Sequence, residues 1–170
     1  VNFMKRLVVG LLFNQARTNI LLAYKFQTSA IINWNGIGGE ISKDEDDFDA
    51  IKRTSKVDLG EDFSWIKFAE NKFLSKVENR YLEPFKVSYF YSFCNNLGAK
   101  FLHFDWIGIQ DSKTRRRSTD NSEDLRIFSI TQLPKVPIEL YWLIPMAKNL
   151  HPNSSEKFKP WYMELNTIYR

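Results

Sequence analysis

The chain has 170 residues, which is enough for one domain with a sizeable core. Its 24 basic and 20 acidic side chains give a net charge of +4, too small an excess to indicate a nucleic-acid-binding protein. No apolar run approaches the roughly 18 residues of a membrane span, so we expect no membrane partner.

The chain begins with two β-rich runs, residues 7–13 and 19–26, and the short polar stretch between them predicts a hairpin. Met4, Lys5 and Arg6 before the first run also match the start of a short signal peptide. However, residues 14–17 predict a turn rather than a small-residue cleavage site. We therefore expect a buried first strand.

A glycine-rich stretch follows, with Gly36, Gly38 and Gly39 close together. Such a cluster predicts a backbone that turns tightly or closely approaches another group. A helix is expected from Glu45 onward, with Ser42 as its N-cap, because serine followed by glutamate three residues later is a capping box.

Apolar spacing predicts which face of this helix is buried. Phe48, Ile51 and Ser55 recur at helical intervals and should share one face. Gly60 lies where a C-terminal cap would fall.

The rest of the chain predicts further strands and one more helix. Expected strands cover residues 63–68, 87–93, 101–109 and 125–130, with a polar loop before the last of them. Residues 136–150 predict a largely buried helix, kinked at Pro145. We expect a single domain over residues 1–150. Residues 151–170 would then be an extension that packs on this domain or lies at a dimer interface.

The stretch from Trp34 to Gly60 resembles the signature box of the Nudix hydrolases. Set on Gly39, the box matches this chain at Gly39, Glu45, Arg53 and Gly60, and nearly at Asp58. The resemblance implies a Nudix-type α/β/α sandwich, in which a mixed β-sheet lies between helices. It also implies hydrolysis of a nucleoside diphosphate linked to another group, with Mg²⁺ as cofactor and Mn²⁺ as a possible substitute.

The box departs from the family pattern at its metal-binding carboxylates. The three acidic positions are Thr54, Val57 and Asp58 here, so two carboxylates are missing and the third is shortened. Magnesium requires several oxygen ligands, and these losses should weaken its site. Asp58 with Glu61 could rebuild the site, as could Glu45 with Asp47; alternatively, these acids form a solvated helix-capping run.

The resemblance assigns roles to residues of this chain. The expected catalytic residues are Asp58, Glu45 and Arg53. The metal ligands would be Asp58, Glu61 and Gly38. The substrate-binding residues would be Gly38, Gly39, Arg115 and Arg116.

The sequence is compatible with two functions. The chain is a Mg²⁺-dependent nucleotide pyrophosphohydrolase with a divergent metal site, or a catalytically inactive Nudix-fold protein that binds a nucleotide or a protein partner. A weaker alternative is RNA binding through Arg115–Arg117, which would require a steep salt dependence. The single cysteine, Cys94, excludes an intrachain disulfide and favours a cytoplasmic location. A homodimer is also possible.

Overall fold

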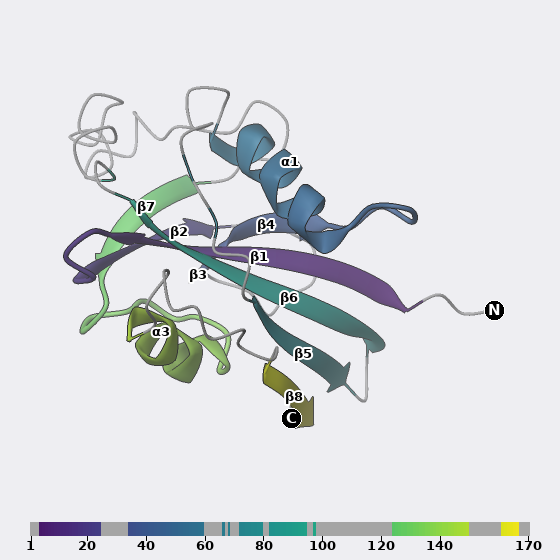
Figure 1. Ribbon diagram of the computed structural model, residues 1–170. Coiled ribbons are helices and arrows are strands. Elements are labelled where there is room, and N and C mark those ends of the chain that lie inside the picture. The colour runs from purple at the N-terminus through teal and green to yellow at the C-terminus, as the bar shows by residue number, and fades with distance from the viewer. Residues whose placement is uncertain are drawn as a thin grey trace.

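The computed structural model describes residues 4–24, 34–59, 72–79, 82–94, 124–149 and 161–166, together with residues 66, 68 and 97. Its elements are β1 (Lys5–Asn14), β2 (Asn19–Tyr24), β3 (Trp34–Asn35), β4 (Ile37–Glu40), α1 (Asp47–Leu59), β5 (Lys72–Asn79), β6 (Leu82–Cys94), β7 (Asp124–Ser129), α3 (Leu140–Lys148) and β8 (Trp161–Asn166). Figure 1 shows their arrangement.

Strand β1 is the centre of a mixed sheet of eight strands. One edge of β1 pairs in parallel with β6 over its whole length, from Lys5 opposite Phe85 to Asn14 opposite Cys94. The other edge pairs antiparallel with β4 first and with β2 near the hairpin turn. Beyond these strands, β3 and β7 pair with β2, while β5 and then β8 extend the sheet from β6.

The two helices cover opposite faces of the sheet (Figure 1), and strand alternation divides the core accordingly. Val8 and Leu12 of β1 belong to the cluster that includes Ile51 of α1. Leu11 and Phe13 belong to the cluster that includes residues of α3. This arrangement confirms the predicted α/β/α sandwich. Neither helix in the described part of the chain is long and apolar enough to cross a bilayer.

The predicted hairpin is confirmed. β1 and β2 are antiparallel, and the Asn14 side-chain oxygen accepts hydrogen bonds from the backbone amides of Thr18 (2.8 Å) and Asn19 (2.9 Å). Arg17 adopts a positive φ of 59° in this turn. Its guanidinium donates to the Lys148 carbonyl (2.9 Å), so the turn is fastened to the C-terminal end of α3.

Two later strands are also present. The run 87–93 lies inside the longer β6, and the run 125–130 corresponds to β7. The predicted strand 101–109 lies outside the described residues. Of the segment 63–68, only residues 66 and 68 are described, and neither is in a strand.

The start of the first helix differs from the prediction. α1 begins at Asp47, and its cap is Asp46 rather than Ser42. The Asp46 carboxylate accepts the Phe48 amide (3.1 Å), and its carbonyl accepts the Ala50 amide (2.9 Å). The predicted pairing of Ser42 with Glu45 does occur, but in a turn before the helix, where the Ser42 amide donates to the Glu45 carboxylate (3.1 Å).

The second helix is shorter than predicted, because α3 begins at Leu140 rather than at residue 136. Pro137 disfavours helical backbone at Val136, and a turn follows in which the Leu140 amide donates to the Pro137 carbonyl (2.9 Å). Pro145 lies inside the helix, as expected. Part of the predicted C-terminal extension forms β8 beside β5.

Replacing Gly38 with alanine should destabilise the fold strongly. Gly38 has a φ of 151°, and a Cβ placed there would collide with the Val8 carbonyl oxygen of the paired strand. We expect a loss of more than about 3 kcal/mol in the free energy of unfolding, measured by denaturant titration. Gly39→Ala is the matched control. Its Cβ would meet only the Thr54 side chain, at 3.0 Å, and should cost about 1 kcal/mol. Equal losses in the two variants would contradict this account of β4.

Candidate functional site

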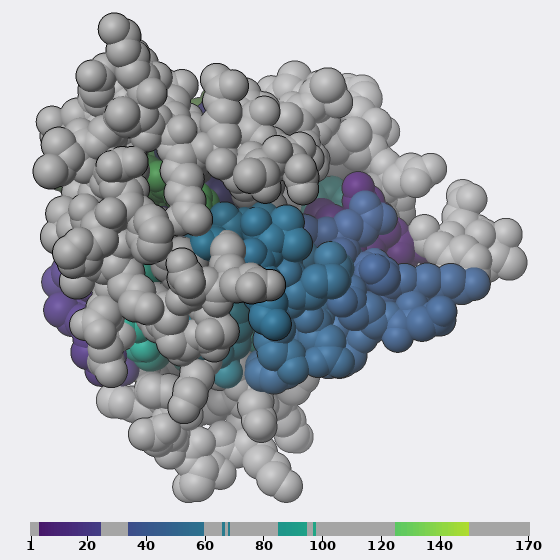
Figure 2. Space-filling view, turned by 90° about the horizontal axis from the view of Figure 1, so that it is seen from above, coloured from purple at the N-terminus to yellow at the C-terminus, as the bar shows by residue number. Residues whose placement is uncertain are grey.

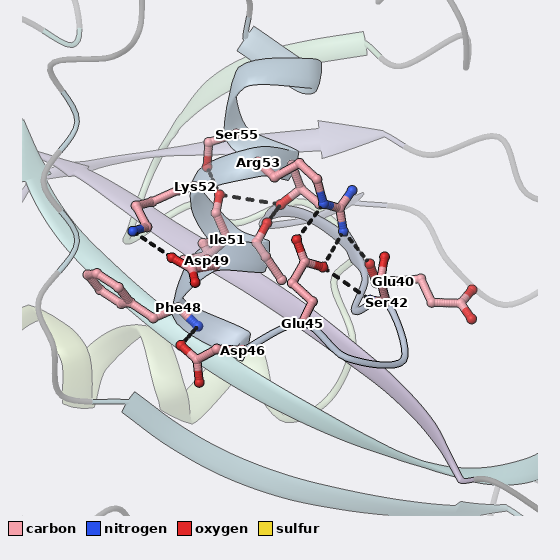
Figure 3. Close-up of polar contacts among 12 residues, drawn as sticks. Glu40, Ser42, Glu45, Asp46, Phe48, Asp49, Ile51, Lys52, Arg53 and Ser55 are labelled. Atoms are coloured by element: carbon pink, nitrogen blue, oxygen red, sulfur yellow. Dashed lines mark hydrogen bonds and ion pairs between the residues drawn. The ribbon is translucent and has the colours of Figure 1, made fainter.

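The segment before α1 is held by one arginine of that helix. Arg53 donates from Nε to Glu45 Oε1 (2.7 Å) and from Nη2 to Glu45 Oε2 (2.8 Å), and Nη2 also reaches the Glu40 carbonyl (2.9 Å) (Figure 3). Arg6 of β1 donates to the Glu45 carbonyl (3.2 Å). The forked contact of a guanidinium with a carboxylate is the stronger type of charged hydrogen bond. We refer to Glu40, Glu45 and Arg53 as the clasp.

The clasp determines the charge state of Glu45. Hydrogen bonds from the Arg53 guanidinium, and then from the Ser42 amide, lower the pKa of Glu45 to about 2. The same contact raises the pKa of Arg53. Glu45 is therefore ionised near neutral pH with both oxygens engaged, which fits a residue that positions the segment rather than one that accepts a proton.

A second contact joins α1 to β4, the strand that contains Gly38 and Gly39. Asp58, a buried residue near the end of α1, accepts a hydrogen bond on Oδ2 from the Gly38 amide (3.1 Å). Gly39 next to it lies against Thr54, so a side chain at position 39 would press on that residue. α1 and β4 are thus in direct contact, and the Asp58 carboxylate contributes a hydrogen bond to this contact. Hydrogen bonds to charged groups contribute about 1.5–3 kcal/mol.

The two remaining acidic positions of the box carry no carboxylate. Thr54 is buried, and its hydroxyl donates to the Ala50 carbonyl of its own helix (2.9 Å). Val57 points outward and is 54% exposed. Lys52, Arg53, Lys56 and Val57 of α1 are exposed. Figure 2 shows the surface of this part of the chain in blue. Lys52 pairs with Asp49 (2.8 Å) and Arg53 with Glu45 (2.7 Å), so positions 54 and 57 lack the carboxylates of the family pattern while Lys56 adds a positive charge nearby.

Among the described residues, α1 offers one carboxylate at the three acidic positions of the box. Asp58 is the one carboxylate of the three box positions, and one of its oxygens accepts the Gly38 amide. Asp47 is eleven residues away along the helix, about 16 Å, so it cannot share an ion with Asp58. Among the described residues no group of three acidic, histidine or cysteine side chains could hold a metal.

The structure brings the predicted site residues together in two pairs: Glu45 with Arg53, and Asp58 with Gly38. Gly60, Glu61, Arg115 and Arg116 lie outside the described residues, so their assigned roles stay predictions. Sequence reasoning missed the Glu40 carbonyl and Arg6. A backbone acceptor can come from any residue type, and Arg6 lies 39 residues before Glu45.

Replacing Glu45 with glutamine tests the clasp. The pKa of Glu45 is lower in the folded protein than its ordinary 4.5, so the pair stabilises the fold above pH 4.5. This contribution should be lost as the pH falls from 4.5 through about 2. Denaturation midpoints measured across this range should therefore fall less steeply in Glu45→Gln than in the parent protein. The matched control is Glu40→Gln. The Glu40 side chain is exposed and pairs with the exposed Lys5 (3.3 Å), a type of contact that contributes little, so the slope should change little. Parallel curves for Glu45→Gln and the parent protein would refute the pairing.

Comparisons with known proteins agree with this geometry at the level of the fold. No protein-family model and no curated protein matches the sequence. Among solved structures, a Caenorhabditis elegans Ap4A hydrolase in a binary complex is similar with a TM-score of 0.58 and 13% identity, covering 84% of this chain and 93% of that one. A MutT Nudix hydrolase from Burkholderia pseudomallei has a TM-score of 0.57 and 15% identity, covering 86% of this chain and 98% of that one. The chain is a Nudix-fold protein.

Proposed function

We propose that this protein binds a nucleotide-type ligand beside α1 and β4 and does not hydrolyse it efficiently. The observation that carries the proposal is the combination of an intact clasp with a helix that has lost its acidic face. Glu45 and Arg53 are paired, whereas Thr54 is bonded to its own helix and Val57 is exposed.

The chemistry of hydrolysis explains the second half of the proposal. A metal ion must neutralise the phosphate chain and activate the attacking water, and magnesium does this with carboxylate oxygens around it. On α1 the one box carboxylate, Asp58, is engaged with the Gly38 amide. Binding needs less than hydrolysis, because a bound ligand requires neutralisation of its charge but no activated water.

Cations on α1 support metal-independent binding. Lys56 is exposed and adjacent to Val57. Arg53, three residues before Lys56, is paired with Glu45, so Lys56 is the cation of this part of α1 that we assign to the ligand. A lysine ammonium is a compact positive charge suited to a phosphate group. The choice of a nucleotide follows the fold neighbours, one of which is an Ap4A hydrolase. The ligand class we propose is a nucleoside diphosphate linked to another group.

A hydrolase with a rebuilt metal site is the second candidate. It is favoured by one observation: Asp58 keeps a carboxylate next to the backbone of Gly38, the two groups assigned to the metal. In this case Glu61 would supply a further oxygen ligand, as the sequence predicts. Turnover distinguishes the two functions.

Calorimetric titration with a panel of nucleoside diphosphate derivatives and triphosphates is the test. We expect one class to bind equally well in EDTA and in magnesium, with no product detected by chromatography after long incubation. Lys56→Gln should weaken this binding by about tenfold, since a charge contact of about 1.4 kcal/mol is lost. Lys135→Gln, an exposed lysine before α3 on the other face of the sheet, is the matched control and should bind normally. Magnesium-dependent turnover that Asp58→Asn abolishes would establish the second candidate instead.

Introducing a carboxylate at position 57 tests whether the acid missing from the box limits magnesium binding at α1. Val57→Glu places an acid beside Asp58 without disturbing the core, because Val57 is half exposed. Magnesium alone should leave the melting temperature of the parent protein unchanged and raise that of Val57→Glu, because a ligand that binds only the folded state stabilises it. Val57→Gln, whose side chain has the shape of the introduced glutamate but no charge, should show no change in melting temperature with magnesium. A magnesium-induced rise in the parent protein would show that its site is complete without residue 57.

A further inference from the structure

A buried acid lies on the face of the sheet opposite α1. Glu139, the residue before α3, is 8% exposed. Its backbone carbonyl accepts the Leu143 amide (2.9 Å), while its side chain makes no capping bond to the helix. The carboxylate instead accepts a hydrogen bond from the Tyr89 hydroxyl of β6 (3.2 Å), a contact that joins residues 50 apart in the sequence.

The surroundings of this carboxyl group are apolar. Leu140 and Leu143 of α3 and Val87 of β6 belong to the cluster between this helix and the sheet. The described ionisable side chains on this side of the sheet come from the strands, from the turn between β1 and β2, and from α3 with the segment just before it. They are Lys5, Arg17, Tyr24, Tyr89, Tyr91, Arg126, Lys135, Tyr141 and Lys148. Of these, Tyr89 is the hydrogen-bonding partner of Glu139, and within the described part of the chain Glu139 makes no ion pair.

We infer that Glu139 and Tyr89 form a proton-dependent latch that holds the start of α3 against the sheet. In its neutral form the buried carboxyl group needs only hydrogen bonds. Once ionised, it is a buried charge that faces a hydroxyl and makes no ion pair with a cation of the described residues, and a buried charge without an ionic partner is costly. The inference does not depend on ligand binding at α1.

The direction of the pH dependence follows from burial. Removal from water raises the pKa of Glu139 above its ordinary 4.5, and the hydrogen bonds, including that from Tyr89, oppose this rise only in part. The stabilising contribution of the buried neutral Glu139 is therefore complete below pH 4.5 and is lost as the pH rises through the pKa of the folded protein, because the Tyr89 hydrogen bond offsets only part of the cost of burying the charge.

Denaturation midpoints of the parent protein and of Glu139→Gln, measured at several pH values from about 4.5 to about 8, test the latch. Glutamine keeps an oxygen that accepts the Tyr89 hydroxyl but cannot ionise. We expect Glu139→Gln to lose the decline in midpoint with rising pH and to be the more stable protein at neutral pH. Glu40→Gln, the same change at an exposed position, should keep the parent slope. Identical slopes for Glu139→Gln and the parent protein would overturn the inference.

An infrared measurement tests the latch if Glu139→Gln does not fold. The infrared band of a protonated carboxylic acid should disappear as the pH rises, and Tyr89→Phe should shift this disappearance to higher pH. The reason is that the tyrosine hydroxyl stabilises the ionised form, and phenylalanine removes it. A band whose pH dependence is the same in Tyr89→Phe and the parent protein would overturn the inference.

Discussion

The closeness of β4 to β1 is the constraint on which the candidate site depends. Gly38 lies so near the Val8 carbonyl that only glycine fits, and its own amide donates to Asp58. The strand is therefore held on one side by the sheet and on the other by α1. The clasp then holds the segment that joins β4 to α1, through contacts of Arg53 with the Glu45 carboxylate and the Glu40 carbonyl.

None of these interactions needs a metal ion. Backbone pairing, a buried carboxylate that accepts an amide and an arginine–glutamate fork maintain the shape of the corner between β4 and α1 by themselves. The fold around this corner is thus maintained although positions 54 and 57 of α1 carry no carboxylate. On the outer side of α1, Lys56 and Val57 are exposed.

Local patterns predicted the local structure. The hairpin, the buried face of α1 and the existence of the late helix follow from alternation and helical spacing, which depend on neighbouring residues. The resemblance of residues 34–60 to a known box added the layered fold and singled out Glu45, Arg53 and Asp58, but not the contacts that they make. The predicted cap of α1 was wrong because Ser42 and Asp46 both suit the role, and the pairing of Glu45 with Arg53, eight residues later, is not part of a capping pattern.

Other features could not be derived from sequence patterns. The parallel pairing of β1 with β6 joins strands about 80 residues apart, and periodicity carries no information on such partners. The burial of Glu139 contradicts the general exposure of glutamate, and only the packing of α3 on β6 explains it. The exposed state of Val57, by contrast, follows from its helical position once the buried face is known.

Amide resonances of β4 and of Gly36 just before it offer the most direct test of the central claim. The measurement is a nuclear magnetic resonance titration with the tightest-binding nucleotide, following Gly36, Gly38 and Gly39 together with the amides of α1, in EDTA and in magnesium. Our account predicts shifts concentrated at β4 and around Lys56, with the same affinity in both conditions and an unchanged ligand spectrum. Shifts that appear only with magnesium, accompanied by resonances of a hydrolysis product, would contradict it.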